Sequence, residues 1–170
     1  MIRHWTRGQW ALRLVVLIGP VLATLAAGPT GDPPGRLALV VVVATSLGSA
    51  LAPESPAGTL AFATVLLSWG LGGSAVTPPE VVLAAGALVA AHVAALVVSY
   101  GPGDVPLDRR LTLTWLVRGA VLFLVAPVVW LLATALEGQP EPAGLWMTGV
   151  AALVVAAVVA NTALGSRMTS

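Results

Sequence analysis

Apolar residues in this chain fall into long continuous runs and do not alternate with polar residues. Runs of this kind are typical of helices that cross a membrane, each of which needs about 20 apolar residues. The pattern predicts an all-α fold, a polytopic transmembrane bundle of about six helices in a single domain over residues 1–170. The expected helices cover residues 10–27, 37–52, 58–71, 81–100, 111–136 and 145–164.

The second and third runs, 37–52 and 58–71, are shorter than the about 17–25 residues of an ordinary span. They are expected to form either a short helical hairpin that thins the bilayer or a re-entrant pair. Proline-rich segments at 28–35, 73–79 and 137–142 would each join an outgoing helix to a returning one. The chain therefore reads as three in–out–in hairpins, unless the likeness of its loops is compositional alone.

Residues at the ends of the runs predict where helices begin. Asp108 precedes the fifth run and is a good N-cap residue. Thr77-Pro78-Pro79-Glu80 has the spacing of a capping box, in which Thr77 and Glu80 bond to each other's backbone N–H groups. The first run, which ends in Leu25-Ala26-Ala27, also resembles a secretory signal, but leucine fits the cleavage site poorly, so we expect a retained helix.

The arginines predict the orientation, because basic residues collect on the cytoplasmic side of membrane proteins. With the N-terminus inside, only Arg36 would lie outside the cell. The cytoplasmic side would hold Arg3, Arg7, Arg109, Arg110 and Arg167, with Arg13 and Arg118 at inner helix ends. We therefore expect a multi-pass protein of the inner or plasma membrane with both termini in the cytoplasm.

Composition narrows the class of protein further. Charged residues make up only 9% of the chain, against about 25% in soluble domains. The net charge of +1 provides no basic field to hold nucleic acid. The absence of cysteine excludes disulfides and thiolate chemistry. The abundance of Ala, Val, Leu, Gly and Pro, with arginine in place of lysine, is typical of a GC-rich bacterial genome.

Small residues at helical spacing predict where helices pack, because they let backbones approach closely inside a membrane. The run 81–100 has two such rows, and shorter rows occur at 44–52 and 152–160. The two rows of 81–100 are Gly86, Ala90, Ala94 and Ala87, Ala91, Ala95.

His92 is the only ionisable side chain near the middle of a run, and it borders the Ala91/Ala95 row. Ionisable groups inside membranes are candidates for function, and imidazole titrates near neutral pH. His92 would serve as a proton relay or substrate contact, or else as a neutral hydrogen-bonding group between helices. Asn161 is expected to hold helices together rather than to bind a ligand.

Arginines and prolines within the runs offer further candidates. Arg13, Arg109, Arg110 and Arg118 lie at the inner interface, where they would set orientation or contact anionic lipid headgroups. Pro20 and Pro127 each remove a backbone hydrogen bond and are expected to kink their helices.

The sequence contains no pairing of a nucleophile with a base, no paired membrane carboxylates and no phosphate-binding glycine motif, so we expect no enzyme, cofactor or metal site. We expect a non-catalytic subunit or scaffold that assembles with itself or another membrane protein through the small-residue rows. The alternative is a small transporter or lipid-handling protein that uses His92 and the proline-kinked helices.

Overall fold

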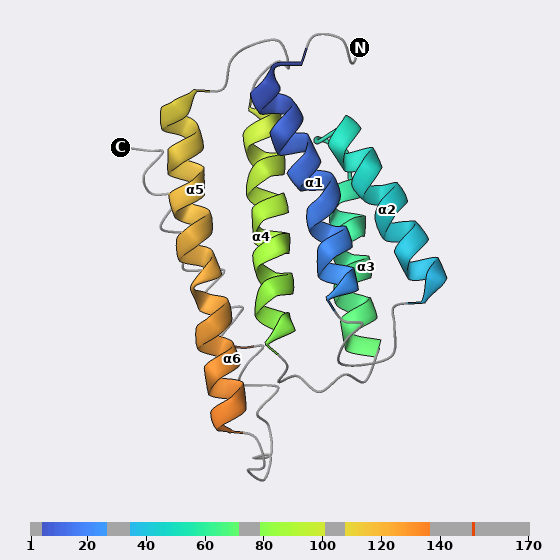
Figure 1. The fold of residues 1–170 in the computed structure, drawn as a ribbon, viewed down its shortest axis with the longest axis vertical. Coiled ribbons are helices and arrows are strands. Elements are labelled where there is room, and N and C mark those ends of the chain that lie inside the picture. Colours follow the sequence, from blue (N-terminus) through green and yellow to red (C-terminus); the bar gives the residue numbers. More distant parts are fainter. Residues whose placement is uncertain (1–4, 27–34, 72–78, 101–107, 137–150, 152–170) are drawn as a thin grey trace. The chain divides into compact units, whose positions relative to one another are not determined.

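A computed structural model describes residues 5–26, 35–71, 79–100, 108–136 and 151 (Figure 1). Every secondary-structure element among them is an α-helix, as the sequence predicts. The chain divides into two compact units, residues 1–135 and 136–170, and the helices described below all belong to the first. The expected helix at 145–164 lies outside the described residues except for Ala151, so five apolar helical stretches are described where six were predicted.

The helices are α1 (Arg7–Leu25), α2 (Arg36–Leu51), α3 (Ala57–Leu71), α4 (Glu80–Ser99), α5 (Arg109–Phe123) and α6 (Val125–Ala135). Helices α1 to α5 follow one another in alternating directions along the chain, and α6 continues in the direction of α5 (Figure 1). Residues 52–56 join the second helix to the third.

Three stretches are long and apolar enough to cross a membrane, namely α1, α4 and the continuous stretch Arg109–Ala135 that comprises α5 and α6. This supports the prediction of a membrane-embedded helical protein. The shorter helices α2 and α3 follow the two short runs of the sequence. At 1.5 Å per residue, the 16 residues of α2 extend roughly 24 Å, less than the bilayer's hydrocarbon core of about 30 Å.

Helix starts show how local chemistry sets the boundaries. Thr6 caps α1 by accepting a hydrogen bond from the Gln9 backbone N–H at 3.4 Å, which starts the helix three residues earlier than predicted. Asp108 caps α5 as predicted, accepting from the Arg110 N–H at 2.9 Å. The predicted capping box is wrong, because α4 begins at Glu80 with Pro79 as its N-cap and no side-chain cap. Pro79 already has a helical φ of −60°.

The two intrahelical prolines have different effects. Helix α1 continues through Pro20, and the Thr24 hydroxyl donates to the Pro20 carbonyl at 2.8 Å. The predicted single helix at 111–136 is instead divided at Leu124 into α5 and α6. Pro127 explains the division, because it has no N–H to donate to the carbonyl of Phe123, the last residue of α5.

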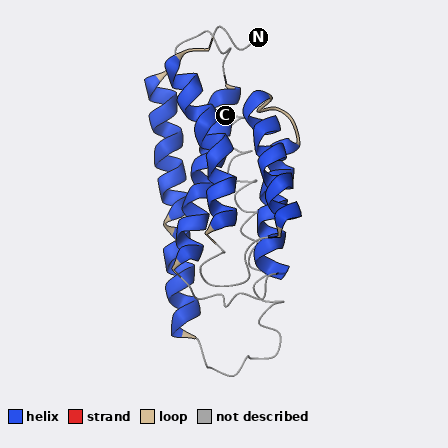
Figure 2. Cartoon of the chain, turned by 45° about the vertical axis from the view of Figure 1, so that its right-hand side comes forward, coloured by secondary structure: helices blue, strands red, loops and turns tan. Residues whose placement is uncertain are grey.

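The core lies among the first four helices, which stand side by side in both ribbon views (Figures 1 and 2). One buried cluster takes a residue from each of them: Ala23 of α1, Val42 of α2, Val65 of α3 and Ala84 of α4. The α1–α4 approach is especially close, because a Cβ added at Gly19 would lie 2.7 Å from both the Ala87 carbonyl oxygen and the Ala91 Cβ. Helix α5 packs against α4.

Candidate functional site

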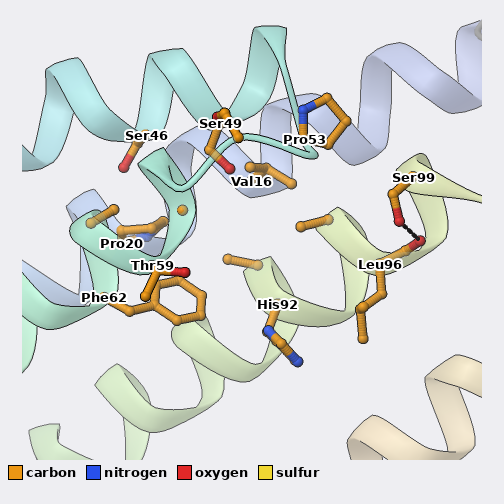
Figure 3. A pocket seen from close by; sticks show the side chains of 15 residues that line it. Val16, Pro20, Ser46, Ser49, Pro53, Thr59, Phe62, His92, Leu96 and Ser99 are labelled. Atoms are coloured by element: carbon orange, nitrogen blue, oxygen red, sulfur yellow. Dashed lines mark hydrogen bonds between the residues drawn. The ribbon is translucent and has the colours of Figure 1, made fainter.

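A cavity of about 280 Å³ lies among helices α1–α4, and its mainly apolar lining includes six residues with polar side chains. Helix α2 and the linker to α3 contribute one side, while α3 and α4 contribute the other (Figure 3). We call it the hydroxyl-lined cavity, after the hydroxyls of Ser46, Ser49, Ser55, Thr59 and Ser99, and His92 is its sixth polar lining residue. The sequence analysis did not identify this group of hydroxyls.

Ser46 is the most informative of these residues. Its side chain is 0% exposed, and its hydroxyl has no hydrogen-bond partner among the described residues. A buried polar group without a partner is rare, because burial removes its bonds to water. The Ser55 hydroxyl at the linker also has no partner in the described part of the chain. In Figure 3 the Ser46 and Ser49 hydroxyls point from α2 toward the side where Phe62 and His92 lie.

Eight helical hydroxyls elsewhere in the described chain differ from that of Ser46. Serine and threonine in helices commonly donate to a carbonyl three or four residues earlier. Such bonds, at 2.7–2.9 Å, are made by Thr24, Thr45, Thr64, Ser68, Ser99, Thr112, Thr114 and Thr134. The cavity therefore contains hydrogen-bonding capacity that the helix backbones do not use.

Glycine brings α3 close to the serine face of α2. A Cβ added at Gly58 would lie 2.9 Å from the Ser49 Oγ, and one added at Gly48 would lie 3.3 Å from the Ala57 Cβ. The α2–α3 hairpin thus packs with little space between its helices near the linker. Ser49 is buried, with 3% of its surface exposed, even though it lines the cavity.

The opposite wall contains His92, the intramembrane candidate from the sequence. Its side chain is exposed, and its ring lies 6.1 Å from the ring of Phe62 on α3. The neighbouring wall is formed by Ala91 and Ala95, whose small side chains leave room beside α1. The wall of the cavity that contains His92 is therefore exposed, and the wall that contains Ser46 is buried.

Arg13 of α1 bonds to the C-terminal end of α2. Its Nη1 donates to the carbonyl oxygens of Ala50 and, at 3.2 Å, Leu51, the last two residues of α2. These carbonyls lack helical partners and carry the partial negative charge of a helix C-terminus. The guanidinium carbon also lies 4.0 Å from the centre of the Trp5 ring. Sequence reasoning placed Arg13 at the membrane interface and missed this contact.

The other basic candidates lie on α5, away from the cavity. Arg109, Arg110 and Arg118 are exposed, and the Arg118 guanidinium carbon lies 5.2 Å from the centre of the Trp115 ring. Trp115 in turn lies 5.7 Å from Tyr100 at the end of α4.

The two small-residue rows of α4 lie on different faces. Ala87 and Ala91 lie against Gly19 of α1, while Ala91 and Ala95 also line the cavity. The row of Gly86, Ala90 and Ala94 lies toward α5, where a Cβ added at Gly86 would be 3.1 Å from the Phe123 ring. Here an apolar groove of about 480 Å³ is lined by residues that include Leu12, Gly86, Ala90, Ala94, Gly119 and Phe123.

Asn161 lies outside the described residues. Within the described ranges, no group of three or more His, Asp or Glu side chains is placed to hold a metal ion. Comparison of the chain with known family models, curated proteins and solved structures gives no match. The fold therefore defines a membrane-embedded helical protein, and the hydroxyl-lined cavity is its candidate functional site.

Proposed function

We propose that this chain is a small transporter that binds a polar solute in the hydroxyl-lined cavity. One observation carries the proposal: Ser46 is completely buried, lines the cavity and has an unpaired hydroxyl among the described residues. A solute with hydrogen-bonding groups would satisfy that hydroxyl. Polar residues that face the interior of a helical membrane bundle commonly mark the path of a substrate.

The topology that goes with this function is a multi-pass arrangement in the cytoplasmic membrane of a bacterium, with both termini inside the cell. Support comes from the alternating helices, which bring the arginine-rich starts of α1 and α5 to one end of the first unit (Figure 1). Arg36 begins α2 at the other end. The segment 145–164 would supply the sixth span and complete three in–out–in hairpins.

Reporter fusions test the topology. Alkaline phosphatase, which is active only outside the cytoplasm, should be active when fused after residue 31 or 75 and inactive after residue 104. The reverse pattern would overturn the proposed orientation. Activity at all three positions would overturn the multi-pass arrangement.

Solute flux tests the transport function. The full chain is reconstituted in liposomes, and the rate of solute entry is followed by light scattering after an osmotic jump. Thr59→Trp should lower the rate, because Thr59 lines the cavity and its exposed side chain leaves room for the larger ring. Thr64→Trp is the matched control, because Thr64 is on the same helix but does not line the cavity. Equal rates for both variants and the unaltered chain would contradict the proposal.

A second candidate, a subunit that assembles through the small-residue row of α4, is favoured by the apolar groove. Ala90 is exposed in this groove, so part of the row remains accessible beside α5. Ala90→Leu would then abolish co-purification of a partner in mild detergent while leaving solute flux unchanged. If no second copy or other membrane protein co-purifies with the unaltered chain, this candidate fails.

A further inference from the structure

The charge of the residues that line the cavity narrows the class of solute, an inference that rests on the proposed transport function. Among the described lining residues, His92 is the only ionisable side chain, and no carboxylate, guanidinium or ammonium group faces the cavity. An ion that leaves water for an apolar interior loses its hydration and needs an opposite charge or metal ligands in return. The lining offers neither to a permanently charged solute.

The hydroxyls define what the solute must present. A serine hydroxyl donates one hydrogen bond and accepts up to two, so it pairs with hydroxyl and amide groups alike. Ser46 and Ser55 have no partner among the described residues, while Ser49 lies between them along α2 and its linker and also lines the cavity. A solute with both donors and acceptors matches this lining, whereas an apolar solute would leave the hydroxyls unpaired.

The volume of the cavity indicates the size of solute that it would hold. Its volume of about 280 Å³ equals roughly nine water molecules at about 30 Å³ each. Sites for drug-sized ligands usually occupy about 300–1,000 Å³. The solute is therefore small, with about nine non-hydrogen atoms or fewer.

We infer that the substrate is a small uncharged polyol or amide, held by the hydroxyls of α2 and its linker on one side and by His92 and Phe62 on the other. Phe62 provides an apolar ring face, and His92, whose ring is tilted by 51° to that of Phe62, provides a polar group opposite the serines. The absence of an acidic lining residue in the described part of the chain argues against a cation as the substrate.

The experiment uses the full chain in liposomes with glycerol and urea as probes. Potassium, chloride and protons are measured in parallel with ion-sensitive dyes. Glycerol or urea should enter faster than in protein-free liposomes, while the three ions should not. Ser46→Ala should lower the rate of solute entry by about fivefold, the effect of losing one typical hydrogen bond.

Ser68→Ala is the matched control. Ser68 is a helical serine on α3 that donates to the Val65 carbonyl at 2.7 Å and does not line the cavity. Its removal should leave solute entry unchanged. Circular dichroism and elution from a sizing column in detergent show whether each variant keeps its fold. A Ser46→Thr variant, which keeps a hydroxyl at this position, should retain most of the rate of solute entry.

The outcomes separate the two proposals. Entry of an ion that depends on Ser46, without entry of glycerol or urea, would overturn the solute class and leave the transport function standing. No protein-dependent entry of any probe would overturn the transport function. Entry of glycerol or urea that is unaffected by Ser46→Ala and Thr59→Trp would overturn the role of this cavity.

Discussion

Helices α1–α4 and the α5–α6 stretch are both apolar, yet they are packed in different ways. In the most apolar part of α1 and of α4, 33% of the residues are buried, against 6% for Arg109–Ala135. The first four helices share buried residues and are joined by polar bonds such as that from the Trp69 Nε1 to the Ala23 carbonyl at 3.0 Å. Helix α6 has no buried residue among those described.

The difference shows that hydrophobicity alone does not determine which membrane helices pack together. Lipid is as apolar as leucine, so helices associate where small residues allow close backbone contact or where polar groups bond between them. Gly19, Gly48 and Gly58 supply such contacts within α1–α4, whereas the described contact of α5 with α4 depends on Gly86 and Gly119. Substitutions at these glycines and at the polar bonds therefore test the difference in packing between α1–α4 and the α5–α6 stretch.

The largest effect is expected at Gly19. Gly19→Ala would push the Ala87 backbone away from α1 and should lower the free energy of unfolding by about 2–3 kcal/mol, near the upper end for overpacked cores. Denaturant unfolding in detergent measures the change. Gly70→Ala is the control, because an added Cβ there meets nothing within 4 Å and should stabilise helix α3 by about 0.5–1 kcal/mol. Equal effects at the two sites would contradict the close α1–α4 packing.

The Arg13 contact should have the next largest effect. Arg13→Gln removes the charge that bonds to the end of α2 and should destabilise the chain by about 1–2 kcal/mol. Arg109→Gln is the control, because Arg109 is exposed at the start of α5, and its effect on the free energy of unfolding should stay within about 0.5 kcal/mol. A result in which both variants unfold alike would show that Arg13 does not join α1 to α2.

Trp69 tests the other polar bond between helices. Trp69→Phe keeps most of the ring but removes the Nε1–H that bonds to the Ala23 carbonyl, at an expected cost of about 1 kcal/mol. Thermal unfolding followed by circular dichroism provides the measurement. Trp10→Phe, at an exposed position, should change the stability less. A larger loss of stability from Trp10→Phe than from Trp69→Phe would show that the Trp69 bond does not stabilise α1–α4.

The smallest effect is expected where α5 meets α4. A Cβ added at Gly119 would lie 2.6 Å from the Cγ2 of Val93, a side-chain atom and not a backbone atom, and Val93 borders the apolar groove, which gives its side chain room to move. Gly119→Ala should therefore cost less than about 1 kcal/mol, and Val93→Ala in the same chain should relieve the clash. Limited proteolysis would show faster cleavage near α5 with no change near α1. Faster cleavage throughout the chain would contradict the separate packing of the two regions.

The sequence predicted where the helices lie along the chain better than it predicted how they begin, divide and pack against one another. Long apolar runs identify α1, α4 and the α5–α6 stretch, because length and hydropathy are local properties. The division at Leu124 required knowing that Pro127 would interrupt the helix, whereas Pro20 does not. The ends of α4 and α1 differed from prediction because capping depends on backbone angles that the residue pattern does not specify.

The candidate site was only partly visible in the sequence. His92 stood out as an ionisable residue within an apolar run, and it does line the cavity. Ser46, Ser49 and Ser55 did not stand out, because serine is ordinary in helices and linkers. Their role depends on the α2–α3 hairpin, which places α2 opposite α4, and that pairing is a tertiary property. The spacing of Ser46 and Ser49, three residues apart on one helix face, was the available signal.

The Arg13 contact also fixes how far α2 lies along the axis of α1. Sliding α2 by one helical turn, about 5.4 Å, would bring Val42 or Ala50 to the height that Ser46 occupies. The cavity would then present a methyl group where it now presents a hydroxyl. A single guanidinium bound to the end of one helix thus determines which side chain lines the cavity about one turn away.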